Sequence, residues 1–149
     1  PSAFEKLIRN TGGIKNITSY NVAISRDDGE ADFFVYPQRS ISSSSTRRSD
    51  SQKSIRIKCV SFKKIFELIG INQIDLLKFD IEGSEYGVFD AGRDHLDKVR
   101  NVVGEVHLDL IHKNEPEFLR LFDGFAVKDI RYINKNKTRL LMVLTEAKS

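Results

Sequence analysis

The spacing of apolar residues alternates along the chain between the period of a helix and that of a strand. Between Ser61 and Gly70, four apolar residues recur at positions i, i+3, i+4 and i+7. A serine before such a stripe and a glycine after it are typical helix ends, so we predict a helix over 62–69. The runs 74–80 and 101–107 are short and mostly apolar, as in parallel strands covered on both faces.

The spacing of apolar and turn-forming residues predicts further elements before and after these segments. Residues 17–24 and 31–36 indicate strands separated by a turn at Asp27-Asp28-Gly29, and the alternation over 55–60 indicates a strand that pairs with 31–36. Helices are predicted near the start of the chain, over 84–89 and over 115–122, and a β-hairpin over 125–133 and 138–145. Strands that alternate with helices before a final hairpin predict an open α/β sheet in a single domain, residues 1–149.

Composition narrows the class of protein. With 40% hydrophobic and 30% charged residues, the 149-residue chain has enough apolar surface for one packed core. A single cysteine, Cys59, excludes an internal disulfide framework and a cysteine-rich zinc site. Cys59 lies on the apolar face of the predicted strand 55–60, where we expect it to be a small buried apolar residue. We therefore expect a reducing, cytoplasmic location, without a membrane span or secretory signal. The net charge of +3 permits an anionic partner without requiring one.

The segment 39–54 differs from the rest of the chain. Eight of the fifteen residues from 40 to 54 are serine, interleaved with basic residues. Such a segment buries too little apolar surface to offset its ordering entropy, so we predict a mobile loop. Its arginines could contact phosphate groups, which makes a non-catalytic binding module an alternative function. No aromatic side chain is interleaved for base stacking, and we expect no nucleic-acid partner.

The candidate chemistry lies where two predicted strands end. Strand 74–80 runs into Asp80 and Glu82, and strand 101–107 ends in His107. Ligands of open α/β sheets bind beyond the carboxyl ends of parallel strands, so these three side chains are expected at one rim. Carboxylates beside an imidazole can support proton transfer. The structural alternative is that Asp80 caps the next helix, Glu82 is a solvated charge at the rim, and His107 is a strand-end histidine whose hydrogen bonds are satisfied within the fold.

Residues 74–85 (IDLLKFDIEGSE) resemble the signature "vDllKiDvEGaE" of the FkbM-type S-adenosylmethionine-dependent methyltransferases. Residues 21–25 and the turn after them are similar to the third strand of that family, and 105–107 to its "Evh" strand. Residues 60–65 are similar to the helix entry "vtLDdl", with Lys63 where the family has Asp, and residues 1–10 to the helix after the second strand.

This resemblance implies a Rossmann-like, mostly parallel methyltransferase sheet with a C-terminal antiparallel hairpin. It implies methyl transfer from S-adenosylmethionine to an oxygen of a hydroxylated small molecule, sugar or lipid. Ala23, Ile24 and Ser25 would line the adenine side of the cofactor. Asp80, Glu82 and His107 would face the acceptor, with Asp80 or His107 as the base.

The sequence departs from that family in one respect. The family's glycine-rich cofactor loop and ribose-binding acidic residue are not recognisable, because Gly12-Gly13 follows a helical pattern rather than a strand. The first two strands of the family fold are missing by this reading. We therefore expect a truncated domain that is inactive alone. Strands 17–24 and 74–80 would then pair directly, or a second chain would complete the sheet in a homodimer.

A metal enzyme is a third alternative. His107 and Asp109 reproduce the His-x-Asp half of a 2-His-1-carboxylate iron site. The other histidines, His95 and His112, do not lie well downstream as the distal ligand of that motif should. We accordingly assign no metal ligands from the sequence.

Overall fold

The computed structural model describes residues 2–35 and 53–147. Its elements in chain order are α1 (Ser2–Thr11), β1 (Ala23–Ile24), β2 (Gly29–Val35), β3 (Lys53–Val60), α2 (Phe62–Ile69), β4 (Leu77–Phe79), α3 (Glu85–Ala91), the 3-10 helix η1 (Arg93–Lys98), β5 (Asn101–His107), α4 (Leu108–Ile111), α5 (Glu115–Leu119), the 3-10 helix η2 (Arg120–Phe122), β6 (Phe125–Tyr132) and β7 (Arg139–Glu146). The predicted α/β class is confirmed.

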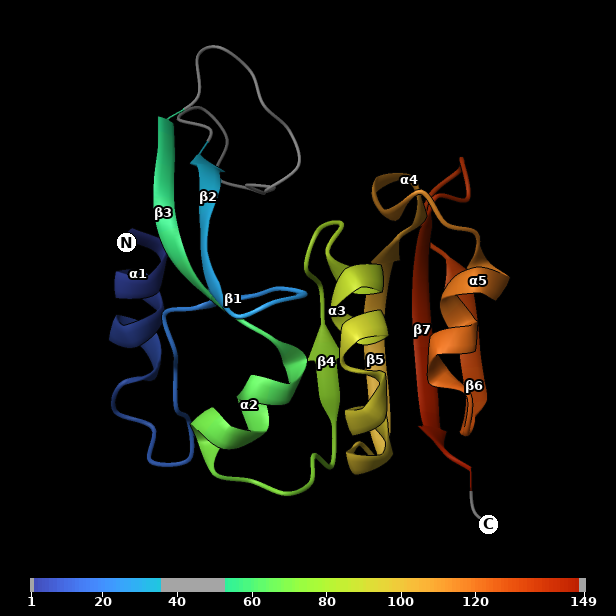
Figure 1. Cartoon of the computed structure of the whole chain (residues 1–149), viewed down its shortest axis with the longest axis horizontal. Coiled ribbons are helices and arrows are strands. Elements are labelled where there is room, and N and C mark those ends of the chain that lie inside the picture. The colour runs from blue at the N-terminus through green and yellow to red at the C-terminus, as the bar shows by residue number, and fades with distance from the viewer. Residues whose placement is uncertain (1, 36–52, 148–149) are drawn as a thin grey trace.

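The strands form two sheets, which stand apart in Figure 1. The three-stranded sheet has the order β1-β3-β2, in which β1 is parallel to β3 and β2 is antiparallel to it. The predicted pairing of 31–36 with 55–60 is confirmed by the β2–β3 register. Helix α2 then leads from β3 toward the second sheet.

The four-stranded sheet has the order β4-β5-β7-β6. Strands β4 and β5 are parallel, whereas β7 is antiparallel to both of its neighbours. The C-terminal hairpin is thus confirmed, with its second strand inserted beside β5. Parallel pairing occurs at β1–β3 and β4–β5, and the other three described pairings are antiparallel.

The hydrophobic core lies between the four-stranded sheet and the helices α2, α3, α5 and η2. Phe89 is at its centre, because its ring lies 4.8 to 6.4 Å from the rings of four other phenylalanines, Phe62, Phe79, Phe118 and Phe122. Gly104 of β5 is opposite Phe79 of β4, where a Cβ would lie 2.1 Å from the ring. Glycine at this position lets the aromatic ring cross the neighbouring strand.

Local sequence signals account for the helix boundaries. Ser61 accepts a hydrogen bond from the Lys64 N–H at 3.2 Å and so caps α2, and Gly70 ends that helix with φ 72°. Asn114 and Glu117 form a reciprocal capping box at the start of α5. The helix predicted over 115–122 is divided, because its last turn tightens into the 3-10 helix η2.

Two predicted strands are shorter than their β propensity indicated. Only Ala23 and Ile24 of 17–24 form a strand, and only Leu77–Phe79 of 74–80, preceded by a bridge between Ile74 and Val99. A strand needs a partner for its backbone groups, and residues 17–22 have none in the described sheets. Because β1 and β4 belong to different sheets, the hypothesis that they pair directly is wrong.

The predicted mobile loop 39–54 lies mostly outside the described residues, and its last two residues begin β3. Cys59 is buried at 6% exposure, as predicted. Among the described helices, none combines the length and apolarity needed to cross a membrane.

Candidate functional site

The loop between β4 and α3 carries Asp80 and Glu82 in an unusual backbone conformation. Glu82 has φ 48° and Gly83 has φ 100°, both in the left-handed region. A Cβ on Gly83 would also lie 2.9 Å from the Leu110 Cβ, so only glycine fits without displacement. A non-glycine residue held at positive φ carries strain, and such residues cluster at functional sites.

Glu85, the first residue of α3, holds this loop by hydrogen bonding to its backbone. Its side chain is fully buried, and both carboxylate oxygens accept the Gly83 N–H, at 3.1 and 2.9 Å. His107, the last residue of β5, is also fully buried and places Nδ1 2.7 Å from Glu85 Oε1. Because a carboxylate only accepts, His107 Nδ1 carries the donated proton, and this bond sets the orientation of the ring.

The other ring nitrogen, Nε2, faces three carboxylates. It lies 3.4 Å from Glu105 Oε1, 3.5 Å from Glu82 Oε2 and 4.0 Å from Asp80 Oδ1. None of these oxygens meets it with hydrogen-bond geometry, so Nε2 is a buried nitrogen without a partner among the described residues. The structure therefore brings together Asp80, Glu82 and His107, the three residues singled out from the sequence.

Sequence reasoning missed Glu85 and Glu105. Glu85 closes the motif that carries Asp80 and Glu82 and lies in the first turn of α3, and the sequence analysis gave it no role. Glu105 is two residues before His107 on the same face of β5, which is a detectable signal because side chains two apart on a strand point the same way. Glu105 also lies 3.4 Å from Arg139 Nη1 on β7.

A cavity of about 750 Å³ separates this cluster from the three-stranded sheet. Asp80 and Glu82 line one part of it, and Ala23, Ile24 and Ser25 line another. The residues expected beside the cofactor and two of those expected beside the acceptor thus share one cavity. His107 lies behind the carboxylates and has no exposed surface of its own.

The comparisons with known proteins point to one family. A family model described as the methyltransferase FkbM domain matches residues 3–133, which is most of the chain. The chain belongs to the FkbM methyltransferase domain family. No curated protein and no solved structure gave a significant match.

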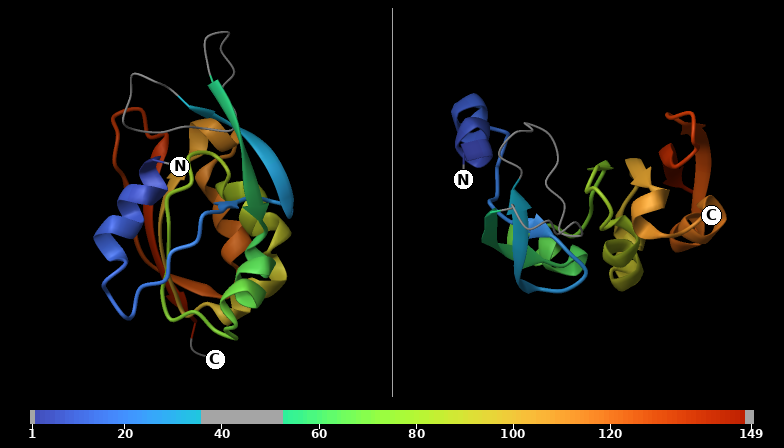
Figure 2. Two further views of the ribbon diagram at one scale, coloured as in Figure 1. Left: turned by 90° about the vertical axis from the view of Figure 1, so that its left-hand side faces the viewer. Right: turned by 90° about the horizontal axis from the view of Figure 1, so that it is seen from above.

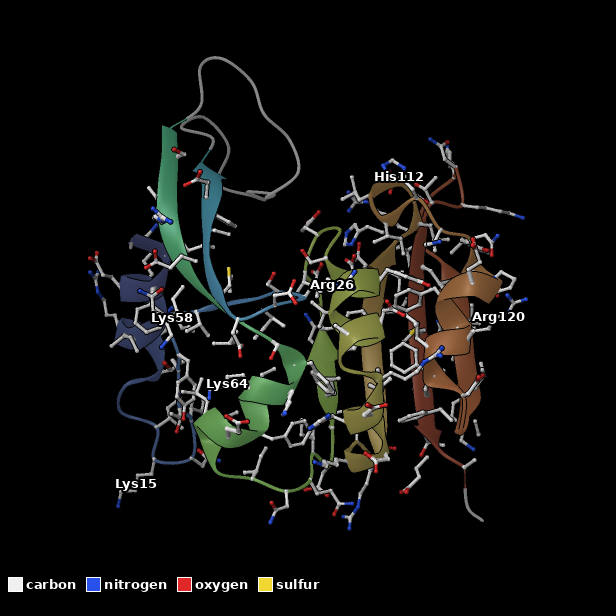
Figure 3. All side chains as sticks on the ribbon, in the orientation of Figure 1. Lys15, Arg26, Lys58, Lys64, His112 and Arg120 are labelled. Atoms are coloured by element: carbon white, nitrogen blue, oxygen red, sulfur yellow. The ribbon has the colours of Figure 1, made fainter. Side chains whose placement is uncertain are left out.

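The cavity wall of this FkbM domain is joined to the helical side by the turn after β1. Asp28 Oδ1 accepts the Ser61 N–H at 2.7 Å, and this bond holds the pKa of Asp28 below its ordinary value of 3.8. Arg26 lies beside α3 in Figure 3, where a Cβ on Gly87 would be 3.7 Å from the Arg26 Cβ. The turn after β1 is thus bound to the start of α2 and lies close to α3.

The His-x-Asp reading of an iron site is not supported by the geometry of the FkbM domain. Asp109 is exposed on α4 and is absent from the group of ligand atoms that converge on His107. His112 is exposed at the end of α4, near the top of Figure 3. The side chains that face His107 Nε2 come instead from β5 and the loop after β4.

Proposed function

We propose that this FkbM domain serves methyl transfer from S-adenosylmethionine to the hydroxyl oxygen of a small molecule, sugar or lipid. The observation that carries the proposal is the shared cavity, with Ala23–Ser25 on one side and Asp80 and Glu82 on another. A methyl donor held at the first wall and an acceptor held at the second would meet inside it. Such a displacement depends above all on positioning.

The reaction needs a group that accepts the hydroxyl proton. The acceptor oxygen forms a bond to the methyl carbon while the carbon–sulfur bond breaks, its electron pair remains on sulfur, and the hydroxyl proton leaves to a base. Asp80 is the residue we assign to this role, because its side chain is 39% exposed and lines the cavity. His107 is fully buried, so we assign it a positioning role through Glu85, which holds the loop that carries Asp80.

We also propose that this chain by itself holds only the adenosine part of the cofactor. The sequence has no glycine-rich loop after a strand that would contact the methionine part. Adenosine and S-adenosylhomocysteine should then bind the 149-residue chain with similar, weak affinity. No methyl transfer is expected from the chain alone.

Nuclear magnetic resonance mapping tests the cofactor wall. Both ligands are expected to shift the backbone amide signals of Ala23, Ile24 and Ser25, and to leave those of the remote strand β6 unchanged. Shifts confined to other elements would contradict the assignment of the wall. Micromolar binding of S-adenosylhomocysteine, far tighter than that of adenosine, would contradict the proposal that the chain is inactive alone.

Transfer of a labelled methyl group tests the reaction in the native gene product, purified from its own cells. We expect label on a hydroxylated acceptor in a bond that survives alkali, as an ether does and an ester does not. Asp80→Asn should lower kcat at least about 100-fold, as loss of a general base does. Asp32→Asn, in the same cavity, is the matched control and should leave kcat unchanged. Label on nitrogen or on a carboxylate would contradict hydroxyl methylation.

A further inference from the structure

Methyl transfer by itself does not explain why Nε2 of His107, a buried nitrogen, has no hydrogen-bond partner among the described residues. Glu85 engages Nδ1, so Nε2 is the nitrogen that faces Asp80, Glu82 and Glu105, and none of their oxygens meets it with hydrogen-bond geometry. Three carboxylates that converge repel one another, and a cation bound between them and Nε2 would relieve this repulsion. We propose that Asp80, Glu82 and His107 bind a divalent transition-metal cation, with Glu105 beside it.

The spacing of the ligand atoms fits one ion. The carboxylate oxygens of Asp80 and Glu82 and a nitrogen of His107 all lie within 4.8 Å of one another. Two ligand atoms bound to one cation at about 2.1 Å each are at most about 4.2 Å apart. Rotation of Asp80 and Glu82, which are 39% and 29% exposed, closes this difference without moving the buried histidine.

The surroundings of the histidine are those of a metal ligand. Metal-binding histidines commonly donate their other ring N–H to a carboxylate, and Glu85 accepts such a bond at 2.7 Å. Glu85 is itself held by the Gly83 N–H in the same loop that presents Asp80 and Glu82. One hydrogen-bonded unit therefore holds the nitrogen ligand and the loop backbone from which the two oxygen ligands extend.

The ligand types indicate which cations fit. Carboxylates alone suit Mg²⁺ or Ca²⁺, whereas an imidazole nitrogen favours first-row transition ions such as Mn²⁺ or Zn²⁺. Asp80 and Glu82 line the cavity, so the positions of the cation that remain open would face it. Arg139 competes for Glu105, which makes Glu105 a neighbour of the cation rather than a required ligand.

The catalytic role of this cation rests on the proposed function, whereas its binding does not. An acceptor hydroxyl in an open position would be polarised by the cation. Asp80 would bind the metal through one carboxylate oxygen and accept the hydroxyl proton on the other.

Titration with Mn²⁺ tests the site on the complete 149-residue chain after chelator treatment and dialysis. We expect one saturable site by electron paramagnetic resonance, with the signal of free Mn²⁺ lost on binding. Modulation from one ¹⁴N nucleus should show the imidazole ligand. Zn²⁺ should displace Mn²⁺, and Ca²⁺ at the same concentration should not. Absence of saturable binding would overturn the proposal, and displacement by Ca²⁺ or absence of ¹⁴N modulation would contradict the role of His107.

Variants separate the site from adventitious binding. Asp80→Asn should weaken Mn²⁺ binding at least about tenfold, and because its side chain is partly exposed this change leaves the core intact. Asp32→Asn removes the same charge from the same cavity and should change the affinity less than twofold. Equal effects of the two substitutions would indicate an adventitious ion only. In the native gene product, methyl transfer that persists in chelator would refute the catalytic role of the cation and leave the proposed function standing. In that same protein, Mn²⁺ binding without methyl transfer to a hydroxylated acceptor would refute the proposed function and leave the metal site standing.

Discussion

The two sheets of this FkbM domain differ sharply in how they are held. Among the residues whose burial the structure describes, the buried apolar ones come from position 62 onward, with the exceptions of Cys59 and Val60. Half-exposed large apolar side chains occur in both regions, at Leu7 and Ile17 as at Leu76 and Val127, but only the second region also has an extensive buried core among the described residues. The right-hand view of Figure 2 separates the two regions in space, with α1 and the three-stranded sheet on one side and the four-stranded sheet on the other.

This difference in packing determines which side chains of the site are held in one orientation. His107 and Glu85 belong to the well-packed region, where burial holds them in one orientation. The three-stranded sheet supplies a cavity wall that is joined to that region by α2 and by the contacts of the turn after β1. The site takes its buried histidine from the well-packed region and one cavity wall from the three-stranded sheet.

The largest expected effect is the loss of an aromatic side chain from the core. Phe89→Ala removes the ring that four other phenylalanines contact, and should lower the free energy of unfolding by about 3–5 kcal/mol. Leu7→Ala, in α1 beside the three-stranded sheet, should lower the free energy of unfolding by under about 1 kcal/mol because Leu7 is 44% exposed. Urea denaturation followed by circular dichroism measures both values. A similar cost for the two substitutions would refute the difference between the regions.

Removal of the buried carboxylate should have the next largest effect. Glu85→Ala leaves the His107 Nδ1–H and the Gly83 N–H without their acceptor, and should destabilise the fold by about 3 kcal/mol. Glu30→Ala is the matched control in the three-stranded sheet, where the ion pair with Arg56 is mostly exposed. It should cost under about 1 kcal/mol. If Glu85→Ala is as mild as the control, the buried pair does not hold the loop.

The fold was predictable where the signal is local. The stripe over 62–69 with Ser61 and Gly70 predicts α2, and the turn residues around Asn134 predict the final hairpin. Strands 17–24 and 74–80 were overpredicted because propensity does not say whether a partner strand is present. The insertion of β7 between β5 and β6 depends on long-range pairing, which no local pattern encodes.

The candidate site was predictable from topology more than from its own residues. Asp80, Glu82 and His107 follow or end neighbouring strands, and this placement alone predicted that they would meet. The role of Glu85 could not be predicted, because a glutamate is rarely fully buried in a folded protein. Only the left-handed residues Glu82 and Gly83 turn the chain so that this carboxylate is buried beneath the loop.

Backbone strain gives a smaller test of the same contrast. Gly83→Ala forces a side chain into a positive φ and against Leu110, and should cost about 1–2 kcal/mol. Gly13→Ala, near the first helix, meets no atom within 4 Å and should be close to neutral. Thermal unfolding of the two variants distinguishes these outcomes. A neutral Gly83→Ala would show that the loop relaxes freely and is not preorganised.

The bond between Asp28 and the Ser61 N–H, at the junction of the two regions, should contribute less stability in acid. The Ser61 N–H holds the pKa of the exposed Asp28 carboxylate below 3.8, so the folded state favours the charged form. The stability that this bond contributes is therefore fully present above about pH 3.8, the ordinary value, and is lost as the pH falls through the lowered pKa. Asp28→Asn should be less stable than the wild type near neutral pH, and the difference should disappear in acid. Asp27→Asn removes the same charge from the same turn and should not reproduce this dependence. Urea midpoints measured from pH 6 to pH 2 compare the three proteins, and a difference that stays constant with pH would show that the junction does not depend on the Asp28 charge.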